Sequence, residues 1–133
     1  MDLEAYKLFQ EKQNLNQIAI DFDGVIHKNS KGFHDGSVYD VPVKGSLDAI
    51  KWFYSLGFEI IIFSAKAKPD RPLLNGKTGK DLIQDWLKKY KINKFVKEVT
   101  SEKPRALVII DDRCIRFENW EKTINFFKLN YTN

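Results

Sequence analysis

Short, mostly apolar runs divide the chain at intervals: Ile18 to Phe22, Phe58 to Phe63, and Leu107 to Ile110. They are rich in β-branched and aromatic residues, and each meets polar residues where it ends. This pattern is typical of strands in a parallel sheet that is covered on both faces. A further short strand is predicted over residues 95–99.

Segments with apolar residues at helical spacing alternate with these runs. Thr78 and Asp81 are spaced as a capping box, which predicts the start of one helix. Two prolines keep residues 66–77 out of a regular helix. The predicted helices lie within residues 1–14, from Gly45 or Ser46 to Gly57, from Thr78 to about Tyr90, and around Trp120 to Phe127.

Strands that alternate with helices predict right-handed βαβ units. The expected fold class is therefore α/β, with a three-layer α/β/α, Rossmann-like arrangement around a mostly parallel sheet. At 133 residues the chain fits one domain, residues 1–133, with an N-terminal helix within 1–14. Residues 24–42 are rich in Gly, Asn, Ser, Asp and Lys, and predict a flap loop or small hairpin over a site.

Composition supports a folded globular domain, because 43% of residues are hydrophobic and 30% are charged. No apolar run approaches the ~20 residues of a membrane span. Met1 to Tyr6 lacks the features of a secretion signal, and the single Cys114 has no partner for an internal disulfide. We expect a cytoplasmic protein without membrane contact.

A net charge of +4 suits an anionic ligand, although the lysines are scattered rather than gathered in a basic stripe. Whether nucleic acid is bound therefore stays open. The basic residues Lys66, Lys68 and Arg71 can hold a second phosphate or form a solvated loop. His27 and His34 fall in the flap, where lone histidines are usually exposed.

Acidic residues follow two of the predicted strands: Asp21 and Asp23 after the first, Asp111 and Asp112 after the last. Ser64 follows the run that ends at Phe63. Because ligands of open α/β sheets bind beyond the carboxyl ends of the strands, we expect these groups to meet at one edge. Four carboxylates there require a cation, and oxygen ligands favour Mg²⁺.

The order of these groups resembles the haloacid dehalogenase-like (HAD) superfamily of phosphohydrolases over roughly residues 18–120. The matching features are Asp-Phe-Asp-Gly from Asp21, a strand-terminal Ser64, Lys103 and the Asp111-Asp112 pair. Residues 102–120 look more narrowly like small, uncharacterised HAD proteins of bacteria and phages.

The resemblance implies a phosphomonoester hydrolase in which Asp21 is the nucleophile and forms an aspartyl-phosphate. Asp23 would be the general acid/base, while Ser64 and Lys103 would hold the phosphate oxygens.

The implied metal is Mg²⁺, held by Asp21, the main-chain carbonyl of Asp23, and Asp111 with help from Asp112. Which of Asp111 and Asp112 binds the metal directly stays open. Val25 and Ser64 stand where the family often has threonine, and neither change removes a reacting group.

The connections around the predicted site leave no room for a separate cap domain, so an open site is expected. Its substrate is a phosphorylated small molecule, such as a nucleotide or sugar phosphate, or a nucleic-acid end. Two alternatives are a phosphoacceptor receiver-like domain and a catalytically inactive binding module. The receiver is disfavoured because Lys103 precedes the final acidic pair here, whereas lysine comes last in a receiver.

Overall fold

The computed structural model describes residues 16–102, 108–111 and 115–130. The helix predicted within residues 1–14, and the predicted site residues Lys103 and Asp112, lie outside these ranges. The described α-helices are α2 (Ser46–Ser55), α3 (Gly79–Lys89) and α4 (Trp120–Asn130). Each coincides with a predicted helix to within a few residues.

The strands form one parallel sheet in the order β3-β2-β1-β4-β5. The predicted α/β class with a parallel sheet is confirmed. The fifth strand, β5, was not predicted, because two residues are too few to produce an alternating pattern. The strands are β1 (Gln17–Asp21), β2 (Glu59–Phe63), β3 (Val96–Thr100), β4 (Val108–Asp111) and β5 (Ile115–Arg116).

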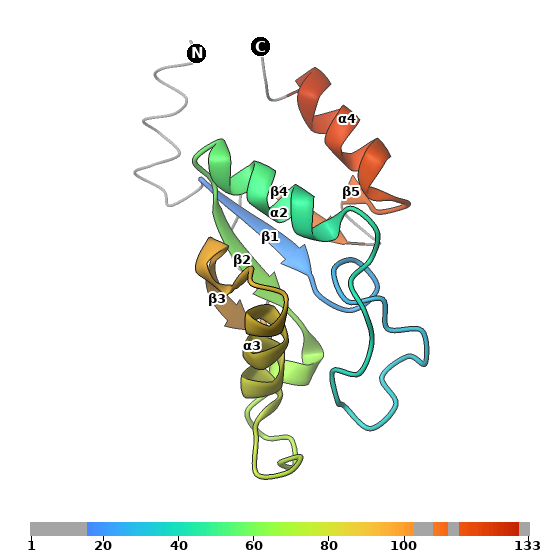
Figure 1. Ribbon diagram of the computed structural model, residues 1–133, viewed down its shortest axis with the longest axis vertical. Coiled ribbons are helices and arrows are strands. Elements are labelled where there is room, and N and C mark those ends of the chain that lie inside the picture. The colour runs from blue at the N-terminus through green and yellow to red at the C-terminus, as the bar shows by residue number, and fades with distance from the viewer. Residues whose placement is uncertain (1–15, 103–107, 112–114, 131–133) are drawn as a thin grey trace.

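The strand order reverses beside β1. The chain runs outward from β1 to β2 and β3, and then returns to β4 on the other side of β1 (Figure 1). Ile20 therefore pairs with Ile62 on one side and with Ile110 on the other. This reversal is the switch point at which open α/β sheets place their ligands.

All three described helices pack against the same face of the sheet. Alternate strand residues point to one face, and those of β1, β2 and β4 share one core with residues of every described helix. Figure 1 shows α2 and α4 next to each other, with α3 nearer to β2 and β3. The core includes Ile18, Ile20, Ile60, Ile62 and Ile110 of the sheet, Ile50 and Phe53 of α2, Ile83, Trp86 and Leu87 of α3, and Trp120 and Phe127 of α4.

Local chemistry explains where two of the helices begin. The Thr78 hydroxyl accepts from the Asp81 amide at 3.1 Å, and the Asp81 carboxylate accepts from the Thr78 amide at 3.3 Å. The predicted capping box is thus formed. Helix α2 begins after Gly45 in a left-handed conformation (φ +85°), where a Cβ would also lie 3.0 Å from Trp120 Cβ.

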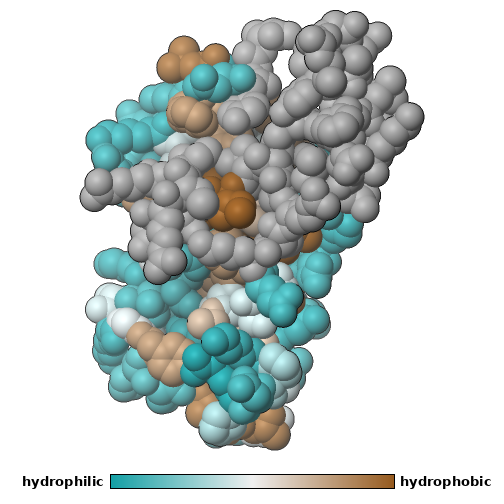
Figure 2. Space-filling model, turned by 180° about the vertical axis from the view of Figure 1, so that it is seen from behind, coloured by the Kyte–Doolittle hydropathy of each residue, from teal (hydrophilic) through white to brown (hydrophobic). Residues whose placement is uncertain are grey.

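Seen from behind, the coloured part of the surface mixes hydrophilic residues with smaller apolar patches (Figure 2). Within the described ranges, none of the helices has the length and apolarity needed to cross a bilayer. The described helices end after at most 11 residues, and α3 carries charged residues along its outer side.

Candidate active site

The ends of three strands bring the predicted site residues to one edge of the sheet. Asp21 is the last residue of β1 and pairs with Phe63, so Ser64 is the next residue along the neighbouring strand. Asp111 ends β4, one residue after the Ile20–Ile110 pair. The backbone of this edge therefore places Asp21 between Ser64 and Asp111.

A tight turn after β1 carries Asp23 over this edge. The Phe22 amide still bonds the Phe63 carbonyl at 3.0 Å, and the Phe22 carbonyl then accepts from the amides of Ile26 and His27. Gly24 takes a positive φ of 83° within the turn, which suits glycine. Buried Val25 and Ile26 fix the turn in the core.

Asp23 and Ser64 are in direct contact, although they come from different strand ends. The Ser64 hydroxyl donates to Asp23 Oδ2 at 2.7 Å. The same hydroxyl oxygen accepts from the Lys66 amide at 3.1 Å, and Ser64 is only 2% exposed. The hydroxyl is thus aimed at the carboxylate from a fixed position.

Lys66 is buried beneath the flap and contacts the other oxygen of Asp23. Its Nζ lies 3.0 Å from Asp23 Oδ1, and the residue is 1% exposed. The expectation of a solvated lysine at this position is wrong. No sign of this role is visible in the sequence because Lys66 lies in a basic segment with Lys68 and Arg71, and only the folded flap covers Lys66.

His27 is also buried, so the expectation of an exposed histidine is wrong here, whereas His34 is exposed as expected. The Asp40 amide donates to His27 Nε2 at 2.9 Å. A backbone amide can only donate, so this nitrogen is unprotonated and Nδ1 carries the hydrogen that points to Asp23 Oδ1, 3.3 Å away. The ring stacks on Phe22, at 5.1 Å between centroids.

These contacts determine the charge of Asp23. Burial raises the pKa of its carboxyl, but hydrogen bonds from His27, Ser64 and Lys66 outweigh burial and bring the pKa below its ordinary value. Asp23 is therefore a carboxylate at neutral pH. The sequence analysis predicted neither the buried lysine nor the imidazole as a partner of Asp23.

Only some of the predicted metal ligands have side chains that the structure describes. Within them, no three Asp, Glu, His or Cys side chains gather at a spacing that would hold a metal. Asp112 lies outside this part of the chain, and Asp111 is described here by its backbone alone. Both carboxylate oxygens of Asp23 are engaged by Ser64, Lys66 and His27, which leaves its main-chain carbonyl as the donor expected from Asp23.

The remaining donors fit a hard cation. Asp21 and Asp111 end adjacent strands at the switch point, and both offer carboxylate oxygens. Together with the Asp23 carbonyl they would make an oxygen-only set, which is the preference of Mg²⁺.

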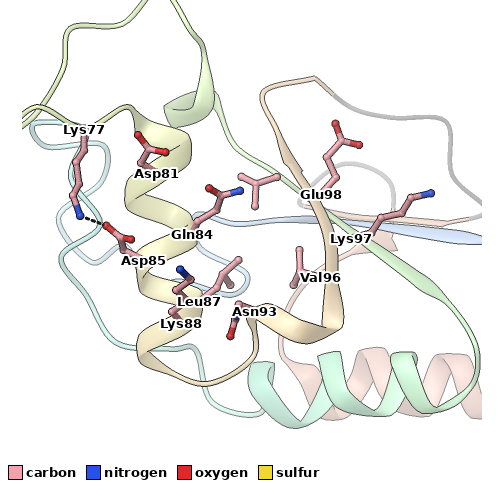
Figure 3. A pocket seen from close by; sticks show the side chains of 11 residues that line it. Lys77, Asp81, Gln84, Asp85, Leu87, Lys88, Asn93, Val96, Lys97 and Glu98 are labelled. Carbon is pink, nitrogen blue, oxygen red and sulfur yellow. Dashed lines mark hydrogen bonds and ion pairs between the residues drawn. The ribbon is translucent and has the colours of Figure 1, made fainter.

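Two hollows lie near α3. The larger, of about 470 Å³, separates α3 from the edge strand β3 and contains the Lys77–Asp85 ion pair (Figure 3). None of Asp21, Asp23 and Ser64 lines it. The second, of about 320 Å³, borders Lys66 between the flap and α3. There the Arg71 guanidinium lies 4.4 Å from the centre of the Phe33 ring.

Comparisons with protein-family models, with curated protein sequences and with solved structures found no match to this chain. The resemblance drawn from the sequence motifs thus stays a prediction, and the geometry of the strand ends is the basis for assigning a function.

Proposed function

We propose that this protein is a Mg²⁺-dependent phosphomonoester hydrolase of the HAD-like, three-layer α/β type, with Asp21 as its nucleophile. One observation carries the proposal: the Ser64 hydroxyl and the Asp23 carboxylate, from two strand ends, meet at 2.7 Å beside Asp21 at the switch point. Carboxylates and a hydroxyl converging there suit the handling of a phosphoryl group.

The reaction has two displacements on phosphorus. In the first, an oxygen of the Asp21 carboxylate attacks phosphorus, the ester P–O bond breaks, and the leaving oxygen takes a proton from Asp23. In the second, Asp23 removes a proton from water as the water oxygen attacks phosphorus, which frees phosphate and restores the Asp21 carboxylate. Because Asp21 ends β1 and Asp23 lies in the turn that follows, one site serves both steps.

The protonation of Asp23 depends on the substrate. In the described structure three hydrogen bonds favour the carboxylate, which is the form needed to accept a proton from water. The first step needs the protonated form. A phosphate dianion brought beside Asp23 repels the carboxylate and raises its pKa, so substrate binding favours the acid.

The other groups stabilise charge on the phosphoryl oxygens. Ser64 is positioned to donate to one of them if its hydroxyl turns from Asp23, and Lys103 is assigned the same role on sequence grounds. Bound Mg²⁺ at Asp21, Asp111 with Asp112, and the Asp23 carbonyl would neutralise the approaching phosphate.

A second candidate, a receiver-like phosphoacceptor, is favoured by one feature. Three hydrogen bonds oppose protonation of Asp23, and a small population of the protonated form slows the release of leaving groups that need a proton. Such a protein would take phosphate from an acyl phosphate and keep it on Asp21. A long-lived phosphoprotein formed from acetyl phosphate, without turnover of phosphate esters, would favour this candidate.

The hydrolase proposal is tested with Asp21→Asn and a matched control, Asp48→Asn, at an exposed position of α2. With Mg²⁺, the wild type and the control should hydrolyse an aryl phosphate, while Asp21→Asn should lose about three or more orders of magnitude in kcat. The substrate panel should include sugar phosphates, nucleotides, and 3′- and 5′-phosphorylated oligonucleotides. No turnover of any of these esters by the wild type would contradict the proposal.

A further inference from the structure

The ammonium of Lys66 makes a complete set of hydrogen bonds in the interior of the protein. Its Nζ is 3.0 Å from Asp23 Oδ1, donates to the Ser37 carbonyl at 3.0 Å, and donates to Asn29 Oδ1 at 3.3 Å. An ammonium has three hydrogens, so each has an acceptor. The Tyr39 ring adds a cation–π contact, with its centre 5.5 Å from Nζ.

These partners come from two parts of the molecule. Asp23 belongs to the turn after β1, whereas Asn29, Ser37 and Tyr39 belong to the outer part of the flap. Burying a charged lysine is costly unless opposite charge and hydrogen bonds compensate, and Asp23 supplies the compensating charge. The burial of Lys66, the position of Asp23 and the position of the flap are therefore mutually dependent.

The backbone of Lys66 is fixed as firmly as its side chain. Lys66 lies in a 3₁₀ turn (Ala65–Ala67) that is capped by the Ser64 hydroxyl at 3.1 Å from the Lys66 amide. Its carbonyl packs so closely on the start of α3 that a Cβ on Gly79 would lie 1.6 Å from the carbonyl oxygen. Ser64 and α3 thus hold Lys66 from two sides.

We propose that Lys66 is a positioning residue, which holds the Asp23 carboxylate beside Ser64 and pins the flap against the strand ends. The flap then acts as a fixed wall of the site. The effect on catalysis rests on the proposed hydrolase function, while the anchoring of the flap does not. A direct contact of Lys66 with a second phosphate is disfavoured, since all three of its donors are used and the residue is 1% exposed.

Two substitutions of Lys66 distinguish the effect of its charge from the effect of its side-chain volume. Lys66→Met keeps an unbranched chain without donors, and Lys66→Arg keeps the charge. The matched control is Lys77→Met, which removes an exposed lysine paired with Asp85 away from the site. Two properties are measured on the full chain: kcat and KM for an aryl phosphate with Mg²⁺, and hydrogen exchange of the amides in residues 24–42.

Lys66→Met should lower kcat about tenfold or more with KM changed less than about threefold, because Asp23 is displaced while the phosphate-binding groups remain. Its flap amides should exchange about tenfold faster than those of the wild type. Lys66→Arg should recover part of both losses, and Lys77→Met should behave as the wild type. A Lys66→Met protein with wild-type kcat and wild-type flap exchange would overturn the proposal.

Turnover and flap exchange distinguish a failure of the hydrolase proposal from a failure of the Lys66 proposal. If the wild type hydrolyses no ester, the hydrolase function fails, but flap exchange still decides whether Lys66 anchors the flap. If Lys66→Met does not fold, Asn29→Gly removes one flap partner at a residue whose φ of 56° suits glycine. Its control is His34→Gly, also in the flap and at φ 53°. Asn29→Gly should speed flap exchange more than His34→Gly, and equal rates would overturn the proposal.

Discussion

At the scale of single residues, some contacts of the site could be predicted from the sequence and others could not. The pairing of Asp23 with Ser64 could be anticipated, because both follow apolar strands. Lys66 and His27 could not, because a lysine in a basic loop and a histidine in a polar flap have no local signal of burial. Their contacts with Asp23 depend on how residues 24–42 fold back over the strand ends.

At this scale the charge of Asp23 predicts a pH dependence. Its pKa is lowered in the folded protein by His27, Ser64 and Lys66. These contacts therefore stabilise the folded protein at pH values above the pKa of an unfolded-chain aspartate, about 3.9. The stabilisation is lost as the pH falls through the lower pKa of Asp23 in the folded protein. Asp23→Asn should therefore lower the free energy of unfolding near pH 7. The difference in free energy of unfolding between this variant and the wild type should shrink below about pH 4. Urea unfolding in metal-free buffer between pH 7 and pH 2 measures this difference. A difference that stays constant over the whole range would contradict the assigned contacts.

At the scale of elements, most boundaries were readable from the chain. Apolar runs identified β1, β2 and β4, and the Thr78–Asp81 capping box gave the start of α3. Strand β5 was missed because its two residues pair only through the tertiary fold. The length of the flap was predicted, but its contacts with Lys66 and α3 were not. In the contact with α3, the Trp86 indole donates to the Asp40 carbonyl at 2.9 Å.

The junction between α3 and the Lys66 turn gives a prediction for Gly79. A Cβ at this position would lie 1.6 Å from the Lys66 carbonyl oxygen and 2.5 Å from its carbon, both of them backbone atoms. Gly79→Ala should lower the free energy of unfolding by about 2 kcal/mol or more, despite the better helix propensity of alanine. The control Lys80→Ala, at an exposed position of the same first turn, should change it by about 0.5 kcal/mol or less. Equal stability of the two variants in urea unfolding would contradict this packing.

At the scale of the whole molecule, alternation of strands and helices predicted the α/β class and a site at the carboxyl edge of the sheet. The strand order β3-β2-β1-β4-β5 came only from the structure. That order puts the end of β1 at the reversal, between the ends of β2 and β4. In the described residues the helices cover one face of the sheet, so the second helical layer of a HAD-like fold remains part of the proposal.

The central claim is that Asp21 takes the phosphoryl group, and trapping that group tests it most directly. The protein is mixed with an aryl phosphate and Mg²⁺, quenched in acid and treated with borohydride, which reduces an acyl phosphate to an alcohol. Peptide mass spectrometry should then find homoserine in place of Asp21, only when substrate and Mg²⁺ were both present. Turnover without any reduction at Asp21, or reduction at another aspartate, would contradict the account.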